Sequence, residues 1–437
     1  MAIDAMTGAS SRSSELFRTA VRELSDRLVE AQRPLRVLNA IQWDESVGRE
    51  FIEGGCRAMP PIGPEWYAAR RPLGFDPERK RDEFADLERD IVRRLGQMSP
   101  LGAIMRRICR EYRAVVDMLD ARGTRGFGRR SQELYGSAGD AFHAGEPTLA
   151  ELGEMMESTL GRVSASDQIR EEPREIPAAR AVEILGARLK AVYPGAELRV
   201  RLSDGIAADA AAGTDYIKLR DGAFFSERDL RVLEVHEGWV HLGTTINGAA
   251  QPWCTFLGKG PPSATVTQEG LAVLTEVMTL SSTPDRLHRL VNRVRAITLA
   301  EDGGDFMDVF RFFRDKGHDE EESFKYAARV FRGTGLSGPP FTKDIAYIKG
   351  FVLTYNFLRL AIAQGKLDRV QLLFAGKTVI DDMKVLAELL TEGLVVAPRH
   401  VPPVFADLRG LAALLSFSRF MSELDYGRLE ADYAGVL

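Results

Sequence analysis

Cysteine is scarce in this sequence, with only three among 437 residues. Cys56, Cys109 and Cys254 include no C-x-x-C pair, and an odd number cannot all be joined in disulfide bonds within one chain. This usage is typical of a reducing compartment. The first residues are polar, carry Asp4 early and lack a basic segment followed by an apolar one, so they do not resemble a secretory signal. We therefore expect a cytoplasmic protein.

The sequence also lacks an excess of basic charge and a long hydrophobic run. Its formal net charge is -5, and no segment interleaves clustered Lys and Arg with aromatic residues. The most apolar late run, residues 351–363, is interrupted by Asn356 and Arg359 and is too short to span a bilayer. We therefore expect neither nucleic acid nor a membrane as a partner.

The chain is too long for one ordinary hydrophobic core. Apolar residues recur at helical spacing within residues 17–28, 84–95 and 104–119, which predicts a helical N-terminal region. A polar, charged segment with two prolines, residues 163–177, is the best candidate boundary. The predicted division is therefore a helical region over residues 1–165 and a second domain over residues 166–437.

The second domain is predicted to contain helices and a small sheet. A helix is expected over residues 178–192, and the patterns of residues 198–202 and 216–219 are typical of strands. Another helix should begin after Ser226, which has Asp229 at the third position to complete a capping box. The predicted fold class is α+β, predominantly helical.

Histidine is rare as well, yet two of the six histidines lie in one stretch, H-E-G-W-V-H at residues 236–241. A later helix, which a Thr265–Gln268 capping box would open, carries Glu269 near its beginning. Two neutral histidines and a glutamate suit catalytic zinc, because three protein ligands leave a tetrahedral position open for water. The pattern favours a zinc-dependent peptidase.

The spacing of the two histidines requires a distorted helix. Residues five apart lie about 140° apart around a regular α-helix, so His236 and His241 could not face one ion. A π-type turn, which hydrogen-bonds residue i to i+5, restores the alignment, and Gly238 makes such a distortion easier. We predict a widened turn between the two histidines.

Each of these residues also has a purely structural interpretation. His236 and His241 could be ordinary histidines on a partly buried helix. Glu269 could be a first-turn glutamate that complements the helix dipole, although its apolar neighbours make an unpaired carboxylate costly to bury. Glu276, seven residues later, could orient a histidine ligand through its second nitrogen or form a surface salt bridge.

Several separated blocks resemble the bacterial family of flavohemoglobin expression-modulating QEGLA motif proteins. They are residues 231–241, Asn247-Gly248, Gln251-Pro252-Trp253 and 268–272, followed by 329–333 and 341–350. That family is similar to the eukaryotic microtubule-associated tyrosine carboxypeptidases, zinc enzymes that remove a C-terminal tyrosine from tubulin. The likeness runs from about residue 175 to about residue 400, and more loosely through the N-terminal helices. It implies a zincin-like metallopeptidase core with a small sheet before the histidine helix.

Carried over residue by residue, the resemblance implies one zinc ion held by His236, His241 and Glu269, with Glu237 as general base. The eukaryotic enzymes usually have Ile-Gly-Thr where this chain has residues 238–240, G-W-V. The ligands are unaffected, but the preference for tyrosine is not carried over, since an acidic tubulin tail is not a reasonable bacterial substrate.

The predicted activity is hydrolysis of a peptide bond at a peptide or protein C-terminus. Glu237 would remove the proton of a zinc-activated water, and Tyr347 could donate a hydrogen bond to the oxyanion. Arg329, Arg332 and Lys343 are candidate cations for the substrate's terminal carboxylate. The strand at residues 216–219 could pair with an extended peptide. For each of the four side chains Tyr347, Arg329, Arg332 and Lys343, a structural role is the more common alternative.

Two other functions remain open from the sequence. A non-catalytic, zinc-binding regulatory protein would need a fourth protein ligand, and Cys254 is the only nearby thiol. An aminopeptidase or endopeptidase could use the same metal site. An aminopeptidase would have an acidic pocket for a substrate amine, whereas a carboxypeptidase would have a basic one.

Overall fold

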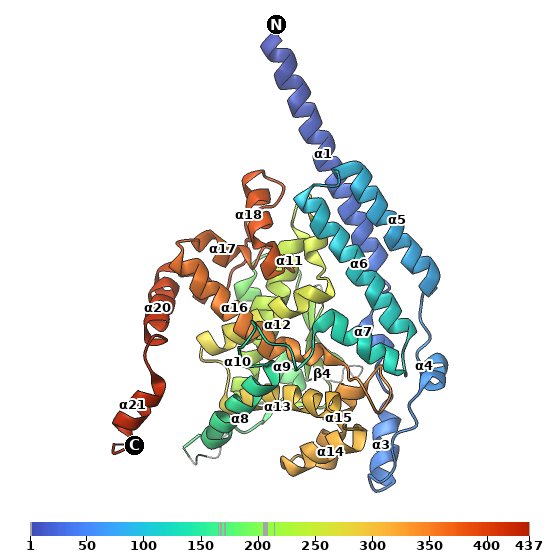
Figure 1. Ribbon diagram of the computed structural model, residues 1–437, viewed down its shortest axis with the longest axis vertical. Coiled ribbons are helices and arrows are strands. Elements are labelled where there is room, and N and C mark those ends of the chain that lie inside the picture. The colour runs from blue at the N-terminus through green and yellow to red at the C-terminus, as the bar shows by residue number, and fades with distance from the viewer. Residues whose placement is uncertain are drawn as a thin grey trace.

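The computed structural model describes residues 2–164, 166, 168–169, 172–203, 209–213 and 215–436. The chain is mostly helical with two small sheets, as predicted. Helices α12 (Pro262–Met278) and α16 (Ala346–Ala363) cross at its centre, and the remaining helices surround them (Figure 1). The start of α1 projects from the body, and the last two helices form an arm at another edge (Figure 1).

The N-terminal region is built from helices alone. They are α1 (Ala2–Gln32), α2 (Val37–Ala40), α3 (Glu45–Glu53), α4 (Pro64–Arg70), α5 (Pro77–Leu95), α6 (Pro100–Asp120), α7 (Arg125–Tyr135) and α8 (Leu149–Ser164). Local signals account for their ends: Asp76 and Ser99 cap α5 and α6, and α5 ends at Gly96, whose φ of 88° suits glycine. The three helices predicted here are confirmed.

Two small sheets follow the helical region. β1 (Ile176–Pro177) pairs antiparallel with β5 (Phe224–Phe225). In the second sheet β4 (Tyr216–Arg220) lies between β2 (Arg199–Ser203), which is parallel to it, and β3 (Ala210–Ala212), which is antiparallel. Helix α9 (Ala178–Val192) shares a core with the apolar face of this sheet. The prediction that β4 would pair with a peptide is wrong, because both of its edges are occupied; β2 and β3 are the edge strands.

The remaining elements complete the fold. They are α10 (Glu227–Leu233), the π-helix η1 (Glu234–Leu242), α11 (Gly243–Ala249), the 3-10 helix η2 (Thr255–Gly258), α13 (Pro284–Glu301), α14 (Phe306–Asp315), α15 (Glu320–Phe331), η3 (Thr342–Ile345), α17 (Leu367–Leu372), η4 (Ile380–Asp382), α18 (Met383–Thr391), α19 (Pro403–Ala406), α20 (Leu408–Met421) and α21 (Tyr426–Tyr433).

Helix α12 begins earlier than predicted. It starts at Pro262 instead of after Thr265, so Glu269 lies in its middle and not in its first turn. Proline is favoured at the first helical position. The N–H of Ser263, which has no acceptor within its own helix, donates to Glu111 of α6 at 2.9 Å, a partner more than 150 positions away. The Thr265–Gln268 capping box is therefore wrong, and so is the helix-dipole interpretation of Glu269.

Helices α12 and α16 approach unusually closely. A Cβ atom placed on Gly270 would lie 2.0 Å from the carbonyl carbon of Gly350, so neither position has room for a side chain. The segment Thr342–Ala363 is long and apolar enough to cross a membrane by length and composition only, and 44% of its most apolar window is buried inside the chain. Its contact with α12 makes it a central packing helix.

Buried apolar residues form two cores. The larger one combines residues from both sides of position 165, for example Leu24 of α1 and Leu271 of α12. The smaller one joins α9, the three-stranded sheet and α10. The division into two domains at residue 165 stays a prediction.

Two motif residues hold the C-terminal part of the chain in place. The Asn247 side chain donates to the carbonyl oxygens of Phe374 and His400, and its oxygen accepts from the backbone N–H of His400 at 3.0 Å. Gln251 binds the Val396 backbone in the same way, accepting from its N–H at 2.8 Å. These buried amides are therefore structural, tying the histidine helix region to residues 374–400.

Candidate metal centre

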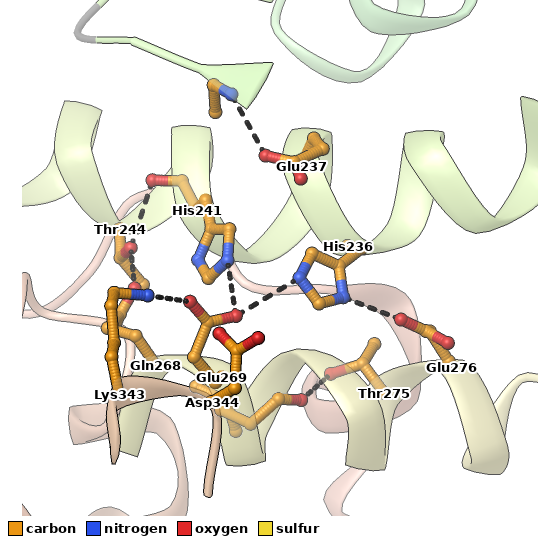
Figure 2. A network of polar contacts seen from close by, with 12 residues as sticks. His236, Glu237, His241, Thr244, Gln268, Glu269, Thr275, Glu276, Lys343 and Asp344 are labelled. Atoms are coloured by element: carbon orange, nitrogen blue, oxygen red, sulfur yellow. Dashed lines mark hydrogen bonds and ion pairs between the residues drawn. The ribbon is translucent and has the colours of Figure 1, made fainter. Parts of the chain in front are cut away.

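The two histidines lie on a π-helix, as their spacing predicted. η1 covers Glu234–Leu242, and its wider turn places the rings of His236 and His241 side by side, with centroids 4.8 Å apart. Figure 2 shows both rings pointing toward α12. The predicted widened turn is confirmed.

Neighbouring side chains support this unusual helix. The capping box of Ser226 and Asp229 starts the preceding helix, as predicted. At the other end the His241 carbonyl accepts from Thr245 at 2.8 Å and from Lys377 at 2.9 Å. Gly238 has no left-handed backbone conformation, but a Cβ there would lie 2.5 Å from Leu189 of α9. Glycine at this position therefore provides packing space more than backbone freedom.

Glu269 of α12 completes a compact ligand set. Its Oε2 atom lies 3.4 Å from Nε2 of His236 and 3.4 Å from Nε2 of His241, and it is buried without a hydrogen-bond partner. Ligands about 2.0–2.1 Å from a tetrahedral zinc are separated from one another by about 3.3–3.4 Å. The three donor atoms, all within 4.8 Å of one another, therefore fit around one cation (Figure 2).

The electrostatics of this group favour a bound positive charge. Burial opposes ionisation of Glu269, yet Lys343, His236 and His241 hold its pKa well below the ordinary value. Burial would also lower the pKa of His236, but the nearby carboxylates Glu269 and Glu276 outweigh it and raise the pKa to about 10. A metal ion would compete with a proton for these ligands, as is expected of a metal site.

Glu276 orients the first histidine. It is fully buried, and its Oε1 lies 2.6 Å from Nδ1 of His236, so the other ring nitrogen faces Glu269 (Figure 2). Arg286 of α13 bonds both carboxylate oxygens, at 2.6 and 2.7 Å. Burial would raise the pKa of Glu276, but Arg286 and His236 lower it to about 2. Of its two predicted roles, the position matches the orienting one and not a surface salt bridge.

Glu237 connects the site to the edge strand β3. Its Oε2 atom accepts from the backbone N–H of Ala212 in β3 at 3.0 Å (Figure 2). The carboxylate is thus held next to the ligand pair by one of its two oxygens. The other oxygen has no hydrogen bond to the described residues.

The four remaining predicted site residues come from the end of α15, from η3 and from the start of α16. Lys343 donates to Oε1 of Glu269 at 3.3 Å, and the Tyr347 ring stacks on His236 with centroids 6.3 Å apart. Arg329 forms a two-pronged ion pair with Asp344, a residue outside the predicted site. Arg332 has its guanidinium over an aromatic ring, 5.6 Å from the centroid of Phe341.

The comparison with known families agrees with this geometry. The sequence profile described as microtubule-associated tyrosine carboxypeptidase matches residues 49–423. The chain belongs to the microtubule-associated tyrosine carboxypeptidase family. No curated protein matches the sequence. Membership confirms the predicted relation to the tyrosine carboxypeptidases, and the matched residues include every side chain of the candidate site.

Some residues of this tyrosine carboxypeptidase family member were not found from the sequence. Arg293 of α13 has its guanidinium 5.0 Å from the Tyr347 ring centroid, and Lys377 reaches Gln268 at 3.0 Å beside the second ligand helix. The one available signal for Arg293 was its position among apolar residues of a helix. A helical arginine is more often solvated, so the signal is weak.

Cys254 stands apart from the ligand group. It is fully buried in the larger core, and burial raises the pKa of its thiol to about 12. Among the described residues, the group able to hold a metal contains His236, His241 and Glu269 only. A closed site with this thiol as fourth ligand therefore has no support in the arrangement.

Proposed function

We propose that the protein is a zinc-dependent carboxypeptidase with a zincin-like core. The observation that carries the proposal is the buried, unpartnered Oε2 atom of Glu269, 3.4 Å from one nitrogen of each of two histidines. A buried carboxylate oxygen without a donor is costly, and a cation shared with both imidazoles would remove that cost. The order of a small sheet followed by the histidine helix supports the zincin-like assignment.

Glu237 is the proposed general base. Held by His236, His241 and Glu269, zinc supplies Lewis acidity, which makes a water more acidic and a carbonyl carbon more electrophilic. Because Ala212 holds Oε2, the other oxygen of Glu237 is free to accept the water's proton as the water oxygen bonds to the carbonyl carbon. The carbon–nitrogen bond then breaks, and Glu237 returns the proton to the leaving amine.

The charges around the site favour a carboxypeptidase over an aminopeptidase. The nearby carboxylates Glu276 and Asp344 are each paired with an arginine, so neither is available to a substrate amine. Arg332, which forms no ion pair with the described residues, is available to a terminal carboxylate, whereas Lys343 already contacts Glu269. The Tyr347 hydroxyl would act as hydrogen-bond donor to the oxyanion.

Strand β3 is the proposed docking edge for the peptide. Gly213 N–H bonds the Tyr216 carbonyl and Arg220 N–H bonds the Asp209 carbonyl, so the positions that flank β3 on either side direct their backbone groups to β4. The backbone groups of Ala210 and Ala212 therefore face the opposite side, toward Glu237. An extended substrate could pair with this edge and place its scissile bond beside the base.

The test is to incubate the zinc-loaded protein with a mixed peptide library and analyse the products by mass spectrometry. We expect loss of single C-terminal residues. Glu237→Gln should keep one zinc per chain and lower the rate at least about 100-fold, because it removes the base and not a ligand. Glu227→Gln, an exposed glutamate on α10, is the matched control and should remain active. An active Glu237→Gln variant, or release of N-terminal residues, would contradict the proposal.

A further inference from the structure

Two arginines beside the site lack the partners that their neighbours have. Arg286 and Arg329 each form a two-pronged ion pair with a carboxylate. Arg293 and Arg332 form no ion pair with the described residues, and the Nε atom of each is buried without a hydrogen-bond partner. Their guanidinium groups lie over the rings of Tyr347 and Phe341, and the nearby carboxylate that attracts both, Asp344, is already the two-pronged partner of Arg329.

Burying unpaired positive charges in one place is unfavourable. Burial and the charge of Arg329 lower the pKa of Arg332 to about 10, and the same two causes lower the pKa of Arg293. A cavity of about 10 Å³ beside Arg293 has room for about one water, which cannot neutralise a charge. Such groups are retained where an anion completes them.

Their position relates them to the proposed reaction. Tyr347 contacts both the metal-ligand side and the arginine side, since its ring stacks on His236 and also lies under Arg293. Arg293 and Arg332 also keep some exposed surface, so they are not closed to solvent. The ring of Tyr347 would therefore lie between an anion at the two arginines and the metal ligand His236.

We propose that Arg293 and Arg332 together form the subsite that binds the free C-terminal carboxylate of the substrate. The assignment rests on the proposed carboxypeptidase function and adds Arg293, which the sequence did not indicate. Arg329 is then a positioning residue, because its guanidinium group already binds Asp344. Lys343 is not part of the subsite, because it already donates to Glu269. Guanidinium groups suit this task because they bind carboxylates with two parallel hydrogen bonds.

The test compares two peptides that differ only in ending as a free acid or as an amide. Binding to the zinc-loaded Glu237→Gln variant is measured by calorimetry, so hydrolysis does not interfere. We expect the acid to bind about 10- to 100-fold more tightly than the amide. Arg293→Met and Arg332→Met should each reduce this ratio toward one, and Arg293→Lys should retain part of it. Arg295→Met, on the same helix but paired with Glu157, should leave it unchanged.

Thermal unfolding separates binding from a structural role. Arg293→Met has no ion pair to lose and should not lower the melting temperature, whereas Arg329→Met should lower it clearly because Asp344 would remain buried and unpaired. An unchanged acid-to-amide ratio in both methionine variants would overturn the subsite, as would a loss of stability in Arg293→Met as large as in Arg329→Met.

The outcomes also separate this subsite from the proposed function. Hydrolysis of acid and amide peptides at equal rates would overturn the carboxylate subsite and leave the zinc peptidase standing. Selective, arginine-dependent binding of the acid without any hydrolysis by the wild-type protein would support the subsite and contradict the peptidase.

Discussion

Replacing Gly270 with alanine should damage the metal site although the residue is not a ligand. Gly270 follows Glu269 on α12 and lies against Gly350 of α16, where an added Cβ would be 2.0 Å from the carbonyl carbon and 2.1 Å from the oxygen. Both contacts are with backbone atoms, which cannot move aside as a flexible side chain would. The helices must therefore separate, and Glu269 must move with α12.

The size of the shift can be worked out from these distances. Ordinary Cβ contacts begin at about 3.4 Å, so the helices must separate by about 1.4 Å. Metal ligands tolerate displacements of only about 0.2–0.5 Å. Overpacking of this kind costs about 1–3 kcal/mol, partly offset by about 1 kcal/mol from the better helix propensity of alanine. We expect a net loss of up to about 2 kcal/mol in unfolding free energy and at least a tenfold loss in zinc affinity.

Urea unfolding and zinc competition with a chromophoric chelator would measure the two effects. Gly350→Ala should act similarly from the other helix, because its Cβ would lie 2.0 Å from the Val266 carbonyl oxygen. The matched control is Gly186→Ala on α9, where the nearest atom is 4.0 Å away; it should stabilise the protein by about 0.5–1 kcal/mol. Unchanged zinc affinity in Gly270→Ala would refute the argument that this glycine positions Glu269.

Two further substitutions test other parts of the structure in three measurements. Glu276→Gln should weaken zinc binding about 10- to 100-fold in the same competition assay, because His236 loses the carboxylate that orients it. The ion pair with Arg286 keeps the pKa of Glu276 at about 2, against an ordinary value of 4.5. The ionised Glu276 therefore stabilises the folded protein fully above about pH 5, and this stabilisation is lost as the pH falls toward 2. Urea unfolding of the metal-free proteins at pH 5 and pH 3 should then show a smaller fall for Glu276→Gln than for wild type; an equal fall would contradict the assignment. Tyr67→Phe should lower the free energy of unfolding, measured in urea at neutral pH, by about 2–4 kcal/mol. The reason is that the Trp43 indole at 2.7 Å and a backbone N–H at 2.6 Å lose the hydroxyl oxygen that accepts from both. A loss below about 1 kcal/mol would show that water replaces the hydroxyl.

The sequence predicted those features that depend on neighbouring residues. Ser226 and Asp229 indicated a helix start because a capping box needs residues only three apart. The π-helix could be predicted because a spacing of five is incompatible with two ligands on a regular helix. The ligand chemistry and the family resemblance predicted one ligand set of His236, His241 and Glu269. The structure places their donor atoms within 4.8 Å of one another.

The errors arose where a distant partner replaces a local signal. Thr265 looked like a helix cap, but Glu111 of another helix satisfies the true start of α12 at Ser263. β4 looked like an available strand because its edge partner β3 is a short run of alanines with no alternating pattern. Arg293 could not be singled out, since what distinguishes it from Arg286 is that it forms no ion pair with the described residues of the folded chain.

The incomplete groups at the site have opposite signs and do not complete one another. The Oε2 atom of Glu269 is an unpartnered acceptor, while Arg293 and Arg332 are cations that form no ion pair with the described residues. If folding alone governed these positions, an arginine would pair with the glutamate, as Arg286 pairs with Glu276. The unpaired glutamate oxygen and the two arginines remain separate because, in the proposed complex, each binds a ligand of opposite charge. A metal ion binds at Glu269, and an anion binds at the arginines. A peptide with its scissile carbonyl at the metal and its terminal carboxylate at the arginines would meet both requirements. Zinc and an acid-ended peptide should therefore bind additively or with positive coupling, and mutual exclusion in a titration would refute this arrangement.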